Sequence, residues 1–164
     1  MYQKILVAID HSAGSEQVFE EALKLAKMMN SRLMLLHVLS SDDAGEFASL
    51  SAGMHSPLVV SNLAEAHRKH WEAYEKKSLE LLRSYAEKAA AANIPAEFTQ
   101  NFGDSGRTIC KLAEMWDADL IVMGRRVLTG LEAWLSDSVS SYVIHHAPCP
   151  VFIVQSKALQ KQGS

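Results

Sequence analysis

The sequence has few of the features that mark specialised classes of protein. It contains two cysteines, Cys110 and Cys149, whose separation fits neither a metal-binding nor a redox motif and implies no disulfide framework. The formal net charge is -3, so no overall basic field favours nucleic acid or an anionic membrane. No apolar stretch approaches transmembrane length, and the run Ile5–Ile9 is too short for a signal peptide. We therefore expect a cytoplasmic protein that binds neither nucleic acid nor membrane.

What is present is typical of one globular domain. Of the 164 residues, 48% are hydrophobic and 21% are charged, and this balance allows one sizeable core. The chain has no internal repeat and no sign of a second domain. We expect one domain over residues 1–155 and a polar C-terminal tail over residues 156–164.

Short apolar runs alternate along the chain with segments of helical spacing. A continuous run rich in β-branched residues suits a strand buried on both faces, and apolar residues three and four apart suit an amphipathic helix. The sequence predicts strands at Ile5–Ile9, Leu33–Leu39, Ala96–Phe102, Leu120–Gly124 and Val151–Val154. It predicts helices from an N-cap at Ser15 to a C-cap at Asn30, over Asn62–Ala92, from a cap at Asp104 or Ser105 to Trp116, and over Ser138–His146.

Two segments differ from this regular pattern. Residues 40–61 show no sustained period, so we expect one long loop there that is functional or mobile. The strand Ala96–Phe102 alternates apolar with polar residues. Such a strand is less buried, and we expect it near an edge of the sheet.

Five strands that alternate with four helices predict an α/β fold. The expected architecture is a single doubly wound, Rossmann-like domain, with a five-stranded parallel sheet flanked by the helices. Ligands of such sheets bind outside the carboxyl ends of the strands, where the strand order reverses. The segments that follow Ile9, Leu39 and Met123 are therefore the candidate binding segments.

The segment after the fourth strand has features of a phosphate site. Gly124 lets the backbone turn and approach a ligand. The helix start at Ser138 offers backbone N–H groups and a positive dipole end. Arg125 and Arg126 can add charge-assisted contacts to phosphate oxygens. Spacing alone equally allows a plain turn with solvated arginines and Ser138 as a simple N-cap.

Several segments together resemble the universal stress protein family. They are Ala8–Ser12, Leu36–Val38, Gly103–Asp104, Ala118–Gly124 and Ser138–Val151. The similarity runs over Lys4–Val154 and lapses only within Ser40–Ile94. The combination of the strand at Asp119–Gly124 with the strand start at His146–Val151 is the most specific part of the resemblance.

The resemblance implies an adenine-nucleotide site, for AMP or ATP, and the adenine nucleotide alpha-hydrolase-like variant of the Rossmann-like fold. By the family's precedent the adenine and ribose would contact Ala8, Ile9, Asp10 and Val38. The phosphates would face Gly124, Arg126, Ser138 and Val139. Met123, Arg125 and Ser140 complete the expected site.

The expected phosphate loop differs from the family's pattern at two positions. Many members bind ATP through a glycine, two residues, a glycine, nine residues, and a glycine followed by serine or threonine. Gly124 and Ser138 match the first and last positions, but Val127 and Asp137 replace the other two glycines. The valine crowds the approach of backbone to phosphate, and the aspartate adds a repelling charge that the two arginines can offset. We expect an intact adenosine half beside an altered phosphate half.

Asp10 ends the first strand at the predicted switch point. Its carboxylate can accept hydrogen bonds from a ribose or help to hold Mg²⁺. The alternative is an Asx-turn or helix cap without any ligand.

The seven histidines suggest no metal site. His67 and His70 are three apart on a helix, with His55 before it, so a surface metal site is geometrically allowed. We interpret them instead as part of a solvated helix face.

Three kinds of function fit the sequence. The first is a nucleotide-binding regulatory module that reports energy or stress to a protein partner. The second is a dimeric scaffold or chaperone-like protein with a vestigial pocket, which Val127 and Asp137 favour. The third is a slow ATPase or an adenylyl transferase, but the His-x-Gly-His and Ser-Gly-Gly-x-Asp-Ser elements of related enzymes are missing. We expect binding rather than catalysis.

The last predicted strand suggests self-association. If Val151–Val154 lies at the sheet edge, its unpaired backbone groups can pair with a second copy about a two-fold axis. Similar proteins often dimerise through this strand. We expect a homodimer.

Overall fold

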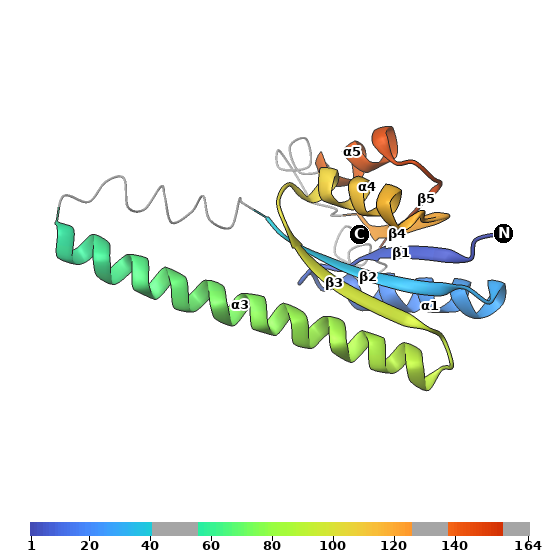
Figure 1. The fold of residues 1–164 in the computed structure, drawn as a ribbon, viewed down its shortest axis with the longest axis horizontal. Coiled ribbons are helices and arrows are strands. Elements are labelled where there is room, and N and C mark those ends of the chain that lie inside the picture. Colours follow the sequence, from blue (N-terminus) through green and yellow to red (C-terminus); the bar gives the residue numbers. More distant parts are fainter. Residues whose placement is uncertain (41–55, 126–137, 156–164) are drawn as a thin grey trace, which may run out of the picture.

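The computed structural model describes residues 1–40, 56–125 and 138–155 (Figure 1). Within these ranges the elements in chain order are β1 Lys4–Ala8, α1 Ser15–Met29, β2 Arg32–Leu39, α3 Pro57–Ala91, β3 Ala96–Phe102, α4 Ser105–Trp116, β4 Leu120–Gly124, α5 Ser138–His146 and β5 Val151–Val154. Most of the predicted long loop, the positions Arg126, Val127 and Asp137, and the polar tail lie outside the described residues.

The strands form one parallel sheet in the order β3-β2-β1-β4-β5. β1 is central, since it pairs with β2 on one side and with β4 on the other. The predicted doubly wound α/β fold is therefore confirmed. The order of strand addition reverses between β1 and β4, so the switch point lies at the carboxyl ends of these two strands.

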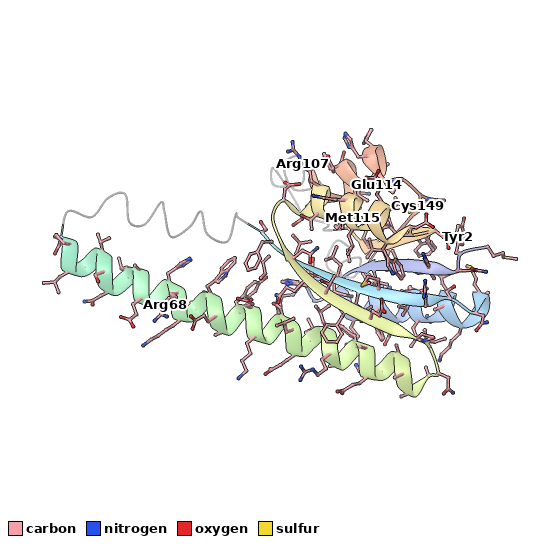
Figure 2. All side chains as sticks on the ribbon, in the orientation of Figure 1. Tyr2, Arg68, Arg107, Glu114, Met115 and Cys149 are labelled. Carbon is pink, nitrogen blue, oxygen red and sulfur yellow. The ribbon has the colours of Figure 1, made fainter. Side chains whose placement is uncertain are left out.

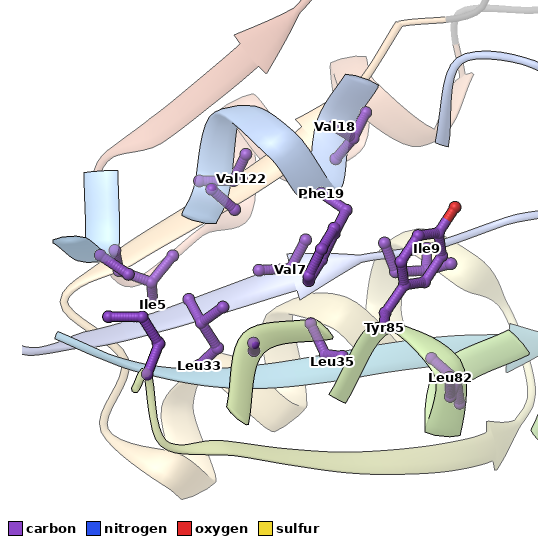
Figure 3. Packing of buried hydrophobic residues seen from close by; sticks show 14 of the residues in the cluster. Ile5, Val7, Ile9, Val18, Phe19, Leu33, Leu35, Leu82, Tyr85 and Val122 are labelled. Carbon is purple, nitrogen blue, oxygen red and sulfur yellow. The ribbon is translucent and has the colours of Figure 1, made fainter. Parts of the chain in front are cut away.

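Helices cover both faces of the sheet. α1 and α3 lie on one face, and α4 and α5 lie on the other (Figure 1). Alternate residues of a strand point to opposite faces, so Ile5 and Val7 join the α1/α3 core whereas Leu6 joins the α4/α5 core. In the α1/α3 core, Phe19 stacks on Tyr85 with ring centroids 4.5 Å apart (Figure 3). Burial on both faces explains why the central strands are continuous apolar runs.

The helix ends follow the capping expectations with one exception. Asn30 ends α1 in the left-handed conformation at φ 55°, and the Asp104 carboxylate accepts a 3.0 Å hydrogen bond from Arg107 N at the start of α4, as predicted. The prediction that Ser15 is the N-cap of α1 is wrong. Gly14 occupies the cap position, and Ser15 is the first helical residue. Its hydroxyl bonds to Asp10 instead.

α3 begins five residues earlier than predicted. The helix starts at Pro57, so residues 57–61 of the predicted loop are helical. Proline is favourable in the first helical turn, where its missing N–H has no partner to lose, and Ser56 precedes it in extended conformation. The sequence pattern places this proline in the predicted loop.

One stripe of side chains runs along the whole of α3. Its members, spaced three, four and four residues apart, are Val60, Leu63, His67, Trp71, Tyr74, Ser78, Leu82, Tyr85 and Ala89. An 11-residue repeat has 3.67 residues per turn, close to the natural helix, so the stripe stays on one side. Its buried members all lie between Ser78 and Ala89. At 35 residues, or about 52 Å, α3 is longer than the strands beneath it.

The N-terminal part of α3 consequently extends past the carboxyl ends of the strands (Figure 1). Arg68 lies on this extension, away from the sheet (Figure 2). Trp71 stacks on Phe102 of the edge strand β3, with ring centroids 6.2 Å apart. The prediction of a less buried edge strand is confirmed, because Phe98 is 36% exposed and Phe102 63% exposed.

Gly106 permits close contact between α4 and α5. A Cβ atom there would lie 2.8 Å from Cδ1 and 3.0 Å from Cγ of Tyr142. We predict that Gly106→Ala lowers the free energy of unfolding by about 1–3 kcal/mol, because an extra carbon in a packed contact forces the helices apart. Urea denaturation measures this change.

The matched control is the same substitution in a Tyr142→Ala background. There the two closest ring atoms are gone, so Gly106→Ala should cost much less. Equal losses in both backgrounds would contradict the packing explanation.

Candidate functional site

The switch point brings together residues that were predicted for both halves of the nucleotide site. Ala8 at the end of β1 and Val38 near the end of β2 border the α4/α5 core. Met123 of β4 is buried in this core, and Val139 at the start of α5 packs against it. Residues from four separate segments therefore line one apolar region on the α4/α5 face, at the carboxyl edge of the sheet.

Ile9 points to the opposite face. Its side chain is 3% exposed within the α1/α3 core, and its N–H donates a 2.8 Å hydrogen bond to Leu36 O. A ligand on the α4/α5 face could therefore meet the backbone of Ile9 but not its side chain. Of the predicted adenosine residues, Ile9 alone has its side chain in the α1/α3 core.

The Asp10 carboxylate organises the turn that follows β1. Its Oδ1 atom accepts a 2.8 Å hydrogen bond from Ser12 N and lies 2.7 Å from Ser15 Oγ. Ser15 Oγ lies equally close to Asp10 O and accepts a 3.0 Å hydrogen bond from Asp10 N. The Asx-turn, the ligand-free alternative for Asp10, is therefore present. It also holds a half-buried carboxylate in a fixed place beside Ala8.

Gly124 has a packing role that needs no ligand. A Cβ atom at this position would lie 3.0 Å from Val18 Cγ2 of α1. The glycine therefore lets α1 lie close over the end of β4. The next residue, Arg125, is exposed and its N–H donates a 3.2 Å hydrogen bond to Val154 O.

The remaining predicted phosphate residues are only partly placed. Ser138 is the first residue of α5, and Ser140 is buried, with 5% of its surface exposed. Arg126 lies outside the described residues, as do the altered motif positions Val127 and Asp137. The structure therefore describes Gly124, Arg125 and the backbone N–H groups at the start of α5 from the predicted phosphate site.

A second cluster, which the sequence did not predict, lies on the α1/α3 face of the same edge. Its members are His11, His37, Tyr74, Ser78 and Gln100. His11 Nε2 is 2.6 Å from Ser78 Oγ, and the Ser78 hydroxyl donates to Tyr74 O at 2.8 Å. Because that hydroxyl gives its proton to Tyr74, it accepts the bond from His11. We call these five residues the histidine cluster.

His37 is the buried centre of this cluster. It is 2% exposed, and its Nδ1 atom accepts a 3.1 Å hydrogen bond from Gln100 Nε2 on the neighbouring strand. Its ring lies edge-on to the rings of His11 and Tyr74, at 5.3 and 5.8 Å. Burial lowers the pKa of His37 from its ordinary 6.5 to about 4, and His11 adds to the shift whereas Asp10 opposes it. The ring is therefore neutral at physiological pH.

One sequence signal could have found this cluster. Tyr74 and Ser78 belong to the same stripe as Leu82, Tyr85 and Ala89, so a repeat count along α3 puts them on the sheet side. His37 stands within a buried strand, where a polar residue needs a partner.

The cysteines show no sign of reactivity. Both thiols are free and half-buried, and burial raises the pKa of each. Among the described residues, no three His, Cys, Asp or Glu side chains gather closely enough to hold a metal ion. In the same part of the chain, no helix combines the length and the apolar character that crossing a membrane requires.

Known proteins share both the sequence and the fold. The family model described as the universal stress protein family matches residues 1–155. Universal stress protein Sll1388 of Synechocystis sp. is 34% identical over 154 residues, which cover 94% of this chain and 98% of that protein. Universal stress protein YxiE of Bacillus subtilis is 32% identical over 155 residues, which cover 94% of this chain and all of that protein (100%).

Solved structures agree at the level of the fold. Universal stress protein UspA from Lactobacillus plantarum superposes with a TM-score of 0.69 at 24% identity, covering 93% of this chain and 97% of its own. A family protein from Arabidopsis thaliana with AMP bound has a TM-score of 0.61 at 21% identity, covering 96% and 94%. A universal stress protein in complex with cAMP has a TM-score of 0.62 at 22% identity, covering 94% and 97%. From the family model and the two curated relatives, this chain belongs to the universal stress protein family.

Proposed function

We propose that this protein binds an adenine nucleotide between the carboxyl ends of β1 and β4 and acts as a regulatory module of the stress response. The observation that carries the proposal is the shared position of Ala8, Val38, Met123 and Val139 beside the ordered Asp10 turn. Similar proteins with AMP or cAMP bound support the same class of ligand. The binding domain is residues 1–155, the span of the family model.

The described residues support the adenosine half of the proposal. An apolar region at the strand ends favours the flat face of adenine, since burying that face removes apolar surface from water. The Asp10 carboxylate can accept charge-assisted hydrogen bonds from ribose hydroxyls. Ser12 and Ser15 already hold it in place, so binding costs less ordering of the protein.

In our proposal, the phosphate half of the site binds its part of the ligand less strongly than the adenosine half does. The start of α5 supplies N–H groups, and Arg125 and Arg126 supply positive charge. Against these, Val127 and Asp137 stand where the ATP-binding pattern has glycines. Each added phosphate therefore gains little, and the site holds AMP about as well as ATP.

The proposed role is binding without turnover. Asp10 is a single carboxylate whose Oδ1 atom is engaged in the turn. Mg²⁺ usually keeps several waters and binds through one or two carboxylates together with substrate phosphates. Asp10 would therefore share any Mg²⁺ with the phosphates of ADP or ATP, and AMP would bind without it.

A dimeric scaffold in the cytoplasm is the second candidate, which the exposed edge strand β5 favours. Among the described strands, β5 pairs with β4 alone, and Phe152 is 41% exposed. Pro150 O accepts a hydrogen bond from β4, and Val154 O accepts one from Arg125, the residue after β4. The alternate residues Val151 and Ile153 therefore direct their backbone groups outward. A second copy can pair with these groups about a two-fold axis.

Calorimetry tests the altered phosphate half. We predict that the dissociation constants of AMP, ADP and ATP agree within about tenfold, because the added phosphates gain little net contact energy. Asp137→Gly should strengthen ATP binding more than AMP binding. ATP bound about a hundredfold more tightly than AMP by the native protein would contradict this account of the loop.

Asp10→Asn separates the ligand role of Asp10 from its turn role. The asparagine oxygen can still accept from Ser12 and Ser15, so we predict a nearly unchanged melting temperature. Loss of the charge should weaken AMP binding about tenfold, since hydrogen bonds to charged groups are worth 1.5–3 kcal/mol. The matched control is Asp104→Asn, another capping carboxylate that follows a strand. A lower melting temperature with unchanged affinity in Asp10→Asn would favour the turn role alone.

Ile153→Pro tests the dimer. Because the Ile153 N–H points away from β4, proline removes a donor that only a partner strand would use. We predict a homodimer for the native protein and a folded monomer for the variant, measured by sedimentation, with Ile153→Val as the dimeric control. A native protein that is monomeric at high micromolar concentration would refute the interface.

A further inference from the structure

α3 is held to the sheet in two different ways along its length. Near its C-terminal end, Leu82, Tyr85 and Ala89 are fully packed into the α1/α3 core. Before them, at the carboxyl edge of the sheet, Ser78 bonds to His11 and Tyr74 packs against His37. The attachment of the segment Trp71–Ser78 to the sheet therefore depends on polar and aromatic contacts rather than on burial in the α1/α3 core.

His37 connects three elements at this place. Gln100 of β3 donates to its Nδ1, Tyr74 of α3 lies against its ring, and His11 approaches from the turn after β1. His11 also packs on Tyr74, with ring centroids 4.8 Å apart. Of these contacts, those with Gln100, Tyr74 and His11 all involve the His37 ring.

Protonation would affect the hydrogen bonds of His11 and His37 differently. His11 donates through Nε2 to Ser78, and this N–H is present whether the ring is neutral or protonated. The Nδ1 atom of His37 accepts a bond, which a proton on Nδ1 would abolish. Rotating the Gln100 amide could restore a bond there, but the new charge would still be buried and would face His11 across 5.3 Å.

Among the described residues, the groups that face His37 are His11 and Asp10 in the turn after β1, Tyr74 on α3 and Gln100 on β3. Asp10 is the one of these that favours a charged His37. Its carboxylate is partly committed to Ser12 and Ser15, and burial outweighs its attraction. The cluster thus holds its central ring neutral.

We propose that His37 is a pH-sensitive contact whose protonation releases the Trp71–Ser78 segment of α3 from the carboxyl edge of the sheet. Release exposes His37 to water, where an imidazolium is well solvated. The C-terminal part of α3 stays in place, because its contacts in the α1/α3 core do not change protonation in this pH range. This inference does not depend on nucleotide binding, so it is tested on the nucleotide-free protein.

The direction and size of the effect follow from linkage. The pKa of His37 is about 4 when buried and 6.5 when exposed, so the open state binds the proton more tightly. Opening is therefore favoured as the pH falls below 6.5, and the increase in the opening equilibrium is complete below 4. Between pH 7.5 and 5.5 the opening equilibrium should rise about tenfold. Ordinary carboxylates stay largely ionised over that interval.

Amide hydrogen exchange measured by mass spectrometry tests the proposal. With rates corrected for the intrinsic pH dependence, we expect protection of peptides covering Trp71–Leu82 to fall about tenfold between pH 7.5 and 5.5. Peptides of β1 and β4 should keep their protection, which distinguishes local release from global unfolding. In His37→Gln, which cannot titrate, the fall should vanish.

His70→Gln is the matched control, because His70 is an exposed residue on the same helix. In this variant the protection of the Trp71–Leu82 peptides should fall with pH as it does in the native protein. Exchange at the C2 position of the histidine rings supplies a second measurement that needs no variant, and His37 should titrate well below 6.5. A constant protection in the native protein, a fall that persists in His37→Gln, or a His37 that titrates near its ordinary value would each overturn the inference.

Discussion

The turn from Asp10 to Ser15 is the constraint on which the carboxyl edge of the sheet beside β1 depends. β1 is buried on both faces, so its last residues must leave the sheet through a polar segment without losing their backbone partners. The Asp10 carboxylate meets this need by accepting from Ser12 N and bonding to Ser15 Oγ, which ties the strand end to the first turn of α1. Without this carboxylate the end of β1 would lose its side-chain link to Ser12 and to Ser15 at the start of α1.

The same turn separates two environments. Ala8 borders the α4/α5 face, where apolar side chains from four segments meet. His11 reaches the α1/α3 face, where it bonds to Ser78 of α3. The proposed nucleotide site on one face and the polar contact of α3 on the other are therefore only a few residues apart along the chain. Alternation of side chains across the sheet keeps them distinct.

Much of the fold could be predicted from the sequence, because its determinants are local. Continuous β-branched runs indicated the buried strands, and the left-handed Asn30 and the capping Asp104 marked helix ends. The start of α3 was misjudged because proline and β-branched residues are weak helix formers in isolation. Pro57 is nevertheless well suited to a first turn.

The parts that could not be predicted depend on partners far apart in sequence. Ser15 looks like a cap until the Asp10 carboxylate competes for its hydroxyl. His37 acquires its role from Tyr74 and Gln100, which α3 and β3 bring to it from distant segments. The repeat along α3 puts Tyr74 on the sheet side, but no local pattern tells which residues it meets there. The adenosine residues, in contrast, were predicted through a family resemblance that carries tertiary information.

The central claim is that an adenine nucleotide lies on the α4/α5 face at the switch point. Methyl NMR spectra recorded during an AMP titration test it most directly. The account predicts saturable shifts for the methyl groups of Ala8, Val38, Met123 and Val139, with little change at Val7, Leu35 and Leu82 on the other face. Shifts confined to the α1/α3 face, or none at millimolar AMP, would contradict it.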